Sequence, residues 1–271
     1  MADPTPTNPT PTNPVVADLV AESEQLDGWV AGLDDAGWET VTTPEGWTVA
    51  HQVAHLLWTD RASLAAIAAG EEWKLLQHVA QQDPTGFVDS ETERLVEIAP
   101  DSLLHHWRDS RHRLSDALAA VPSGTKIEWF GPPMSATSMA TARHMETWAH
   151  GQDVAEALGL EVPRTDRVRN VCHLGVRTRG FAYLMRGLEA PAAEVRVELT
   201  APSGGLWTWG PEDAADRVTG DAWDFALLAT RRRHRDDVDV RAEGDAADGW
   251  LDVIQTFAGL PGNDPVRLAD R

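Results

Sequence analysis

The sequence contains very little cysteine, and Cys172 is its single example. One cysteine cannot form a disulfide within the chain, so a disulfide framework is excluded and a reducing cytoplasm is the expected compartment. The apolar helical surroundings of Cys172 favour a packing residue over a nucleophile.

Basic residues and long apolar runs are also scarce. The chain has 23 Lys and Arg against 43 Asp and Glu, a net charge of −20, which disfavours nucleic acid and anionic membrane surfaces as partners. No uninterrupted apolar run approaches the roughly 18 residues of a membrane-spanning helix, so no membrane partner is expected. What remains is a chain of 271 residues, 42% of them hydrophobic, which is typical of a globular protein with one large domain or two modest ones.

The chain divides by its patterns into three parts. Residues 1–13 are rich in Thr, Pro and Asn and lack basic and apolar segments, so we expect a disordered leader rather than a signal peptide. Helical spacing of apolar residues then predicts a series of helices. These span residues 15–33, 48–69, 100–121, 135–158 and 165–185, with weaker patterns over 71–82 and 88–98.

From Glu194 onward the apolar residues alternate, which is typical of strands. We expect a hairpin of strands 194–200 and 206–209, and then a helix, a short strand and a last helix over 220–230, 238–240 and 250–257. The sequence therefore predicts an α+β fold. An antiparallel four-helix bundle spans residues 14–189, and a small α/β domain spans 192–271.

The most informative motif lies inside the predicted helix 135–158. Glu146 and His150 are four residues apart, so they share a helix face with about 5–6 Å between their Cβ atoms. Asp153 lies on the same face, together with Met and Ala residues. Burying two carboxylates and an imidazole on such a face is costly unless a cation binds them. A divalent metal ion is the simplest explanation.

A second set of candidates lies on the predicted helix 48–69. An apolar stripe that includes Asp60 lies opposite a face with His51 and His55, so we expect this helix to be buried on two sides. Alanines beside His55 leave room for an ion or a substrate. The residues of this helix that are expected to face solvent are Gln52, Arg61 and Ser63.

Together these two segments resemble a known family. Residues 46–56 (Gly-Trp-Thr-Val-Ala-His-Gln-Val-Ala-His-Leu) are similar to the second-helix motif of the DinB / mycothiol-dependent maleylpyruvate isomerase superfamily. Residues 146–153 (Glu-Thr-Trp-Ala-His-Gly-Gln-Asp) resemble its later Glu-x-x-x-His-x-x-Asp motif, and the order and spacing of the two motifs also fit. The C-terminal part resembles the small α/β domain of the isomerase branch. The resemblance therefore covers nearly all of the chain after the leader.

This resemblance implies that His55, Glu146 and His150 ligate one divalent ion between two helices. Three nitrogen and oxygen ligands with an open position are typical of catalytic zinc sites, and bundles build such sites from facing helices. We expect zinc, with nickel, iron or manganese as alternatives. Asp153 is expected to accept the other ring N–H of His150 and so to fix its tautomer. His51 stays an alternative ligand, because pairs of histidines at i and i+4 also bind metals.

A basic segment at residues 231–235 leaves two interpretations open. Acidic residues follow it immediately, and arginines suit a helix C-terminus, so it can be a solvated helix end. The resemblance offers the other interpretation, in which Arg232 matches a family arginine and has a catalytic role. It would bind a substrate carboxylate bidentately from the second domain.

The function that the resemblance implies is that of a metal-dependent isomerase or thiol S-transferase, with mycothiol as cosubstrate. The metal would activate the thiol toward a small electrophilic organic substrate. One alternative is a hydrolase or lyase/cyclase of secondary metabolism that uses metal-bound water, and another is a non-catalytic metal-binding stress-response protein on the same scaffold. In each case we expect a small-molecule partner and a cytoplasmic monomer or homodimer.

Overall fold

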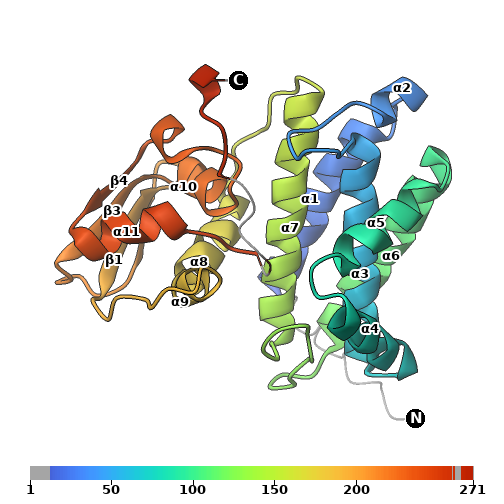
Figure 1. Cartoon of the computed structure of the whole chain (residues 1–271), viewed down its shortest axis with the longest axis horizontal. Helices are drawn as coiled ribbons and strands as arrows, with labels where there is room; N and C mark the ends of the chain where they lie inside the picture. Colours follow the sequence, from blue (N-terminus) through green and yellow to red (C-terminus); the bar gives the residue numbers. More distant parts are fainter. Residues whose placement is uncertain (1–12, 258, 260–263, 271) are drawn as a thin grey trace, which may run out of the picture.

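The computed structural model describes residues 13–257, 259 and 264–270. The expected leader therefore lies outside the described residues, apart from Asn13, whose side chain caps the first helix by accepting from the Val15 backbone N–H. A helical region is followed by a small sheet with helices of its own (Figure 1). The predicted fold class, a helical bundle followed by a small α/β domain, is confirmed.

Four long helices form the bundle, and each follows the helical spacing of the sequence. They are α1 (Pro14–Val30), α3 (Val49–Ala68), α6 (Pro100–Ala120) and α7 (Ala136–Ala157). Helix α3 runs antiparallel to α7, because Gln52 contacts His150 while Asp60, further along α3, contacts Arg143, further back on α7.

Helices α1 and α7 run in the same direction, as their contacts from Asn13 to Thr137 and from Glu22 to His144 indicate. Helix α6 runs against α1, so it is parallel to α3. The bundle is therefore not antiparallel throughout, as expected from the sequence, because two of its packed pairs, α1 with α7 and α3 with α6, are parallel. Parallel helices that follow one another need a long connection between them. The helices α4 (Glu71–Gln82) and α5 (Phe87–Val96) supply it between α3 and α6.

Two helical stretches differ from the pattern that the sequence indicates. A short helix, α2 (Asp35–Trp38), lies between α1 and α3, where the side chain of Asp34 caps it. The predicted helix 165–185 is divided into three pieces: η1 (Asp166–Val168), α8 (Arg169–Arg177) and α9 (Arg179–Leu184). No helix among residues 13–257, 259 and 264–270 is long and apolar enough to cross a membrane.

The sheet has the strand order β2-β1-β3-β4. The predicted hairpin is confirmed as the antiparallel pair β1 (Val195–Thr200) and β2 (Leu206–Trp209), while β3 (Asp216–Asp221) lies parallel to β1 and β4 (Val240–Glu243) antiparallel to β3. Strand β3 was not predicted, because Val218 is its single buried residue and charged neighbours hide any alternation.

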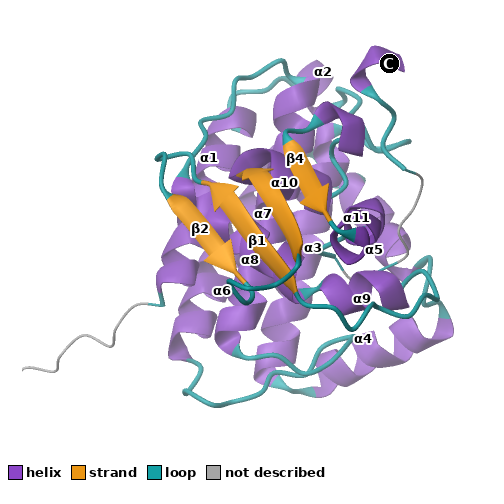
Figure 2. Ribbon diagram, turned by 90° about the vertical axis from the view of Figure 1, so that its left-hand side faces the viewer, coloured by secondary structure: helices purple, strands orange, loops and turns teal. Residues whose placement is uncertain are grey.

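Helices cover one face of this sheet. They are α10 (Ala222–Ala229) and α11 (Asp245–Val253), with the short turns η2 (Arg235–Asp237) and η3 (Leu268–Asp270) nearby in sequence. Figure 2 shows the four strands with the helices behind them. Helix α10 begins two residues later than predicted because Gly220 and Asp221 still belong to β3, and α11 begins five residues before the predicted helix. Gly220 has a φ of 152°, and a Cβ there would lie 2.1 Å from the Asp239 carbonyl oxygen.

Helix α7 belongs to the cores of both regions. Its Met145 and Trp148 pack in the cluster that includes the sheet, and the Trp148 ring centroid lies 5.2 Å from that of Trp223. Cys172 of α8 is buried in the same cluster, where its thiol donates to the Ala222 carbonyl oxygen, in line with a packing role. The division at residues 189–192 stays a prediction, and the packing of α8 and α9 against the sheet favours a division nearer to residue 160.

Candidate metal centre

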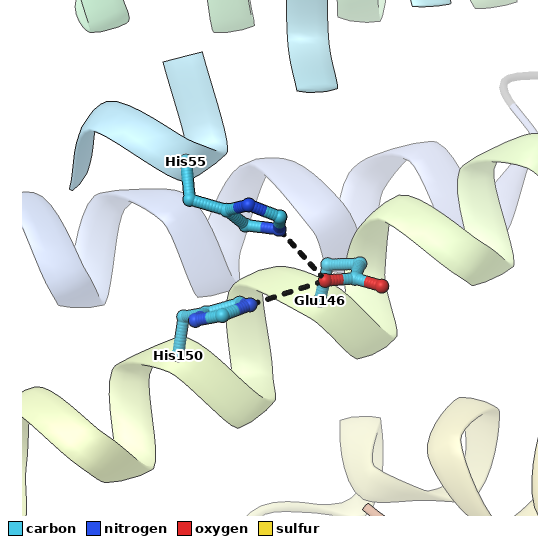
Figure 3. Close-up of side chains that lie close together, drawn as sticks. All are labelled: His55, Glu146 and His150. Carbon is cyan, nitrogen blue, oxygen red and sulfur yellow. Dashed lines mark hydrogen bonds and ion pairs between the residues drawn. The ribbon is translucent and has the colours of Figure 1, made fainter. Parts of the chain in front are cut away.

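The start of α3 sets the position of its histidines. Thr48 precedes the helix, and its backbone N–H donates to Nδ1 of His51 at 3.1 Å, so His51 takes the place that Glu or Gln usually has in a capping box. His55 lies one turn further along, on the side of α3 that faces α7 (Figure 3). Glu146 and His150 project toward it from consecutive turns of α7.

The three side chains converge on one point. Nε2 of His55 lies 3.4 Å from Oε2 of Glu146, and Nε2 of His150 lies 3.1 Å from the same oxygen. One ligand atom from each residue lies within 4.8 Å of the others. The tertiary structure thus brings together the three residues that the sequence singled out as ligands.

The cluster is buried at its imidazoles and open at its carboxylate. His55 and His150 are 9% and 8% exposed, whereas the Glu146 side chain is 22% exposed. Burial lowers the pKa of His150 to about 3, and the neighbouring side chains of His55 and Arg232 act in the same direction. His150 is therefore neutral near pH 7, which is the form of imidazole that binds metals.

An aromatic side chain lies against the imidazoles. The ring of Trp47, just before α3, is stacked at 5.9 Å from His150 and lies 5.5 Å from His55, between ring centroids. Trp58 follows on α3, with its ring 6.3 Å from that of His55. These rings give the cluster apolar surroundings, in which electrostatic interactions are stronger than in water.

The other predicted site residues lie near the cluster but have partners of their own. Nε2 of His51 lies 3.4 Å from the Glu93 carboxylate, and His51 is not among the three residues whose ligand atoms converge. The guanidinium of Arg232 donates to both Asp153 oxygens, at 2.8 and 3.3 Å, and to the Thr230 carbonyl oxygen. Burial raises the pKa of Asp153, and Arg232 opposes this effect.

The hydrogen bond that Asp153 was expected to accept from His150 is made by Gln52 instead. Nδ1 of His150 lies 2.5 Å from the Gln52 side-chain oxygen and 3.9 Å from the nearest Asp153 oxygen. The expectation that Gln52 and Ser63 face solvent was also wrong, since both are fully buried. Polarity alone suggested exposure, and no local signal in the sequence connects Gln52 with a residue on α7.

A second polar contact between α3 and α7 was also missed. Oδ1 of Asp60 accepts a hydrogen bond from Nε of Arg143 at 3.1 Å and forms an ion pair with its Nη2 at 3.1 Å, and both residues are buried. Burial raises the pKa of Asp60, and Arg143 opposes this effect. The position of Asp60 on an apolar stripe was the available signal, because a buried carboxylate needs a partner.

Comparison with known proteins supports the same fold. The profile of the mycothiol maleylpyruvate isomerase N-terminal domain matches residues 19–155, which is about half of the chain and contains the three candidate ligands. A profile described as wyosine base formation matches residues 191–243, which include β1 to β4.

Two full-length relatives come from Mycobacterium tuberculosis: "Uncharacterized protein MT0041" of strain CDC 1551 / Oshkosh and "Uncharacterized protein Rv0036c" of strain ATCC 25618 / H37Rv. Each is 52% identical over 262 residues, covering 97% of this chain and 99% of the relative. Crystal structures of the mycothiol-dependent maleylpyruvate isomerase and of a histidine-to-alanine mutant of that enzyme match with a TM-score of 0.57 at 17% identity, covering 88% of this chain and 96% of theirs. At that identity the likeness shows the fold alone.

The profile match, together with a fold that is shared with the isomerase crystal structures, places the chain in the DinB-like superfamily. Within this superfamily, the match of the isomerase N-terminal domain to half of the chain shows the family. The chain belongs to the mycothiol-dependent maleylpyruvate isomerase family.

Proposed function

We propose that this protein is a metal-dependent enzyme of the mycothiol-dependent isomerase or thiol S-transferase type. The observation that carries the proposal is the convergence of two imidazoles and one carboxylate, from His55, His150 and Glu146, within 4.8 Å in a chain of this family. We expect zinc in this place, with nickel, iron or manganese as alternatives.

The residues suit a divalent ion. His150 is neutral, and Nδ1 of His55 is buried without a hydrogen-bond partner among the described residues. Two nitrogens and one oxygen are a donor set that zinc accepts in catalytic sites. When bound, such an ion lowers the pKa of a thiol or water and stabilises developing negative charge on a substrate.

The chain's own residues would then bind and orient the reactants. Glu146 is the most exposed of the three ligands, so reactants would reach the cluster from its side. In the isomerase reaction a thiolate adds to an electron-poor cis double bond, the adduct rotates about the resulting single bond, and elimination of the thiolate yields the trans product. Trp47 and Trp58 would exclude water from this step. In an S-transferase reaction the adduct takes up a proton and is released.

We further propose Arg232 as the residue that attracts a substrate carboxylate. Its positive charge is one of the causes that lower the pKa of His150, so the guanidinium lies close to the cluster. The pair with Asp153 would hold the guanidinium in place while its remaining N–H groups stay available to a ligand. A cytoplasmic location and a monomeric or dimeric state stay predictions.

The decisive experiment combines reconstitution with a thiol requirement. Protein loaded with zinc would be mixed with maleylpyruvate, with and without mycothiol, and conversion of the cis to the trans isomer would be followed by absorbance. A panel of other electrophiles would be examined by mass spectrometry for thiol adducts. We expect turnover or adducts only when metal and mycothiol are both present.

Cobalt provides a second readout that does not depend on choosing the right substrate. With cobalt in place of zinc, mycothiol should produce a sulfur-to-metal charge-transfer band in the near ultraviolet. Metal-dependent turnover that ignores the thiol would favour the hydrolase or lyase alternative. Stoichiometric metal with no band and no turnover would favour the non-catalytic alternative, and absence of metal binding would refute the proposal.

A further inference from the structure

A directed chain of hydrogen bonds leads from the loop before α3 to the candidate ligand His150. Oγ1 of Thr42 lies 3.0 Å from the Trp47 carbonyl oxygen, Nε2 of Gln52 lies 2.8 Å from Oγ1 of Thr42, and Oε1 of Gln52 lies 2.5 Å from Nδ1 of His150. Thr42 and Gln52 are both buried, at 5% and 0% exposure. Because buried polar groups need hydrogen-bond partners, the loss of any of these contacts would leave a buried donor or acceptor unsatisfied.

The chemistry of the groups fixes the direction of this chain. A carbonyl oxygen can only accept, so the Thr42 hydroxyl must donate to Trp47. The hydroxyl oxygen then accepts from the Gln52 amide nitrogen, which leaves the Gln52 carbonyl oxygen facing His150. Since that oxygen can only accept, Nδ1 of His150 carries the hydrogen.

The position of the hydrogen on His150 decides whether its other ring nitrogen, Nε2, carries a lone pair that could bind a metal ion. A neutral imidazole carries one N–H, so a hydrogen on Nδ1 leaves Nε2 with a free lone pair. Nε2 lies 3.1 Å from Oε2 of Glu146, an oxygen that also can only accept, so Gln52 and Glu146 compete for the single hydrogen of a neutral His150. The contact with Gln52 is the shorter of the two, at 2.5 Å, and therefore favours Nδ1 as the position of the hydrogen. The lone pair thus points to the place where His55 and Glu146 also direct their ligand atoms.

Two neighbours provide contrasts. Asp153 cannot readily replace Gln52 as acceptor, because both of its oxygens accept from Arg232 and the nearer one lies 3.9 Å from Nδ1 of His150. Nδ1 of His55 is buried with no hydrogen-bond partner among the described residues. Of the two imidazoles, only His150 has a hydrogen-bond partner at Nδ1, the nitrogen away from Glu146, among the described residues.

We propose that Gln52 is a positioning residue that locks His150 in the Nδ1–H tautomer, and that Thr42 holds the Gln52 amide in the required orientation. The effect on metal affinity rests on the proposed function, whereas the tautomer itself does not. Groups that fix the far nitrogen of a ligating histidine typically change metal affinity by about 10- to 100-fold.

The first test measures the tautomer in metal-free protein. Nitrogen-15 labelling of histidine distinguishes protonated from unprotonated ring nitrogens in long-range proton–nitrogen spectra. At pH 8 we expect the wild type to show His150 as the Nδ1–H tautomer, and Gln52→Met to show a mixture or the Nε2–H form. The His55 signals should report no comparable change in tautomer. A wild-type His150 protonated at Nε2 would overturn the inference.

The second test measures zinc affinity by competition with a chromophoric chelator. We expect Gln52→Met to weaken binding by about 10- to 100-fold and Thr42→Val to weaken it less. Gln52→Glu keeps an acceptor for Nδ1–H and should bind within a few-fold of the wild type, so its rescue separates positioning from simple packing. Gln152→Met is the matched control, since Gln152 is a buried glutamine on α7 with no hydrogen bond to a candidate ligand among those observed.

The outcomes separate this inference from the proposed function. If the wild type binds zinc and Gln52→Met binds it equally tightly, the positioning role is refuted and the metal site stands. If the wild type binds no zinc, the proposed function fails, and the tautomer spectra still decide whether Gln52 locks His150. Circular dichroism of each variant would verify that it is folded.

Discussion

Two polar clusters join α3 to α7 about one helical turn apart. They differ in what balances the negative charge of the carboxylate in each. In one, the Asp60 carboxylate is balanced by the Arg143 guanidinium. In the other, the Glu146 carboxylate faces His55 and His150, and His150 is neutral because burial lowers its pKa to about 3. The first cluster contains its own cation, whereas in the second a carboxylate whose pKa, despite burial, is lowered by the two histidines faces a neutral His150. The comparison explains why only the second is a candidate metal centre.

The largest expected effect comes from removing a ligand. His55→Ala should abolish retention of about one metal ion per chain and lower kcat/KM by about 1,000-fold, since a catalytic metal supplies several kcal/mol of stabilisation to the transition state. Elemental analysis after dialysis and steady-state kinetics would measure this. Asp60→Asn, which alters the neighbouring cluster, should keep the metal. Equal metal content in His55→Ala and wild type would show that the cluster with His55 is not the metal centre.

Breaking the ion pair should instead affect folding stability. Asp60→Leu leaves the Arg143 guanidinium buried without its partner, so we expect the free energy of unfolding to fall by about 3–5 kcal/mol. The double variant Asp60→Leu/Arg143→Met should lose much less, because it leaves no unpaired charge. Urea denaturation of the single and double variants would measure both values. A single variant no less stable than the double one would contradict this account of the pair.

A third buried imidazole, which belongs to neither cluster, is expected to make folding stability depend on pH. His144 on α7 is fully buried, its ring nitrogens have no hydrogen-bond partner among the described residues, and burial lowers its pKa from 6.5 to about 3. Because the folded-state pKa is depressed, its contribution to stability is complete above about pH 6.5 and is lost as the pH falls toward 3. Between pH 7 and 5 we expect a loss of about 2 kcal/mol.

The measurement is urea denaturation at several pH values. His144→Leu should remove this part of the pH dependence, while the contributions of the other titrating groups remain in both proteins and cancel in the difference. The variant should also retain its metal, since His144 is not one of the converging ligands. Parallel stability curves for variant and wild type would show that His144 is protonated equally in the folded and unfolded chains.

The smallest expected effect concerns the next pair along α7, Asp153 with Arg232. If Arg232 attracts a substrate carboxylate, Arg232→Met should raise KM by about tenfold for an acidic substrate, equivalent to about 1.4 kcal/mol, with little change for its neutral ester. Arg233→Met is the control, since Arg233 pairs with Glu156 one turn further along α7. Equal changes for acid and ester would limit Arg232 to holding Asp153.

Sequence patterns predicted the long helices well and the C-terminal region less well. The bundle helices carry apolar residues at a regular spacing, so α3 and α7 were located to within a few residues. Strand β3 was missed, because its pairing with β1 and β4 supplies the stability that its own side chains do not signal. The pairing partner is far away in the sequence, and local patterns contain no record of it.

The sequence by itself determined which side chains are presented together on each helix. Glu146 and His150 share a face of α7 because their spacing matches the helical repeat, and no distant contact is needed for that. Only the tertiary structure decided which group lies at hydrogen-bond distance from Nδ1 of His150. Gln52 lies 98 residues away on α3, and Arg232, from the C-terminal region, occupies the oxygens of the nearer candidate Asp153. Local geometry places ligands, whereas the choice among their hydrogen-bond partners depends on how distant elements pack.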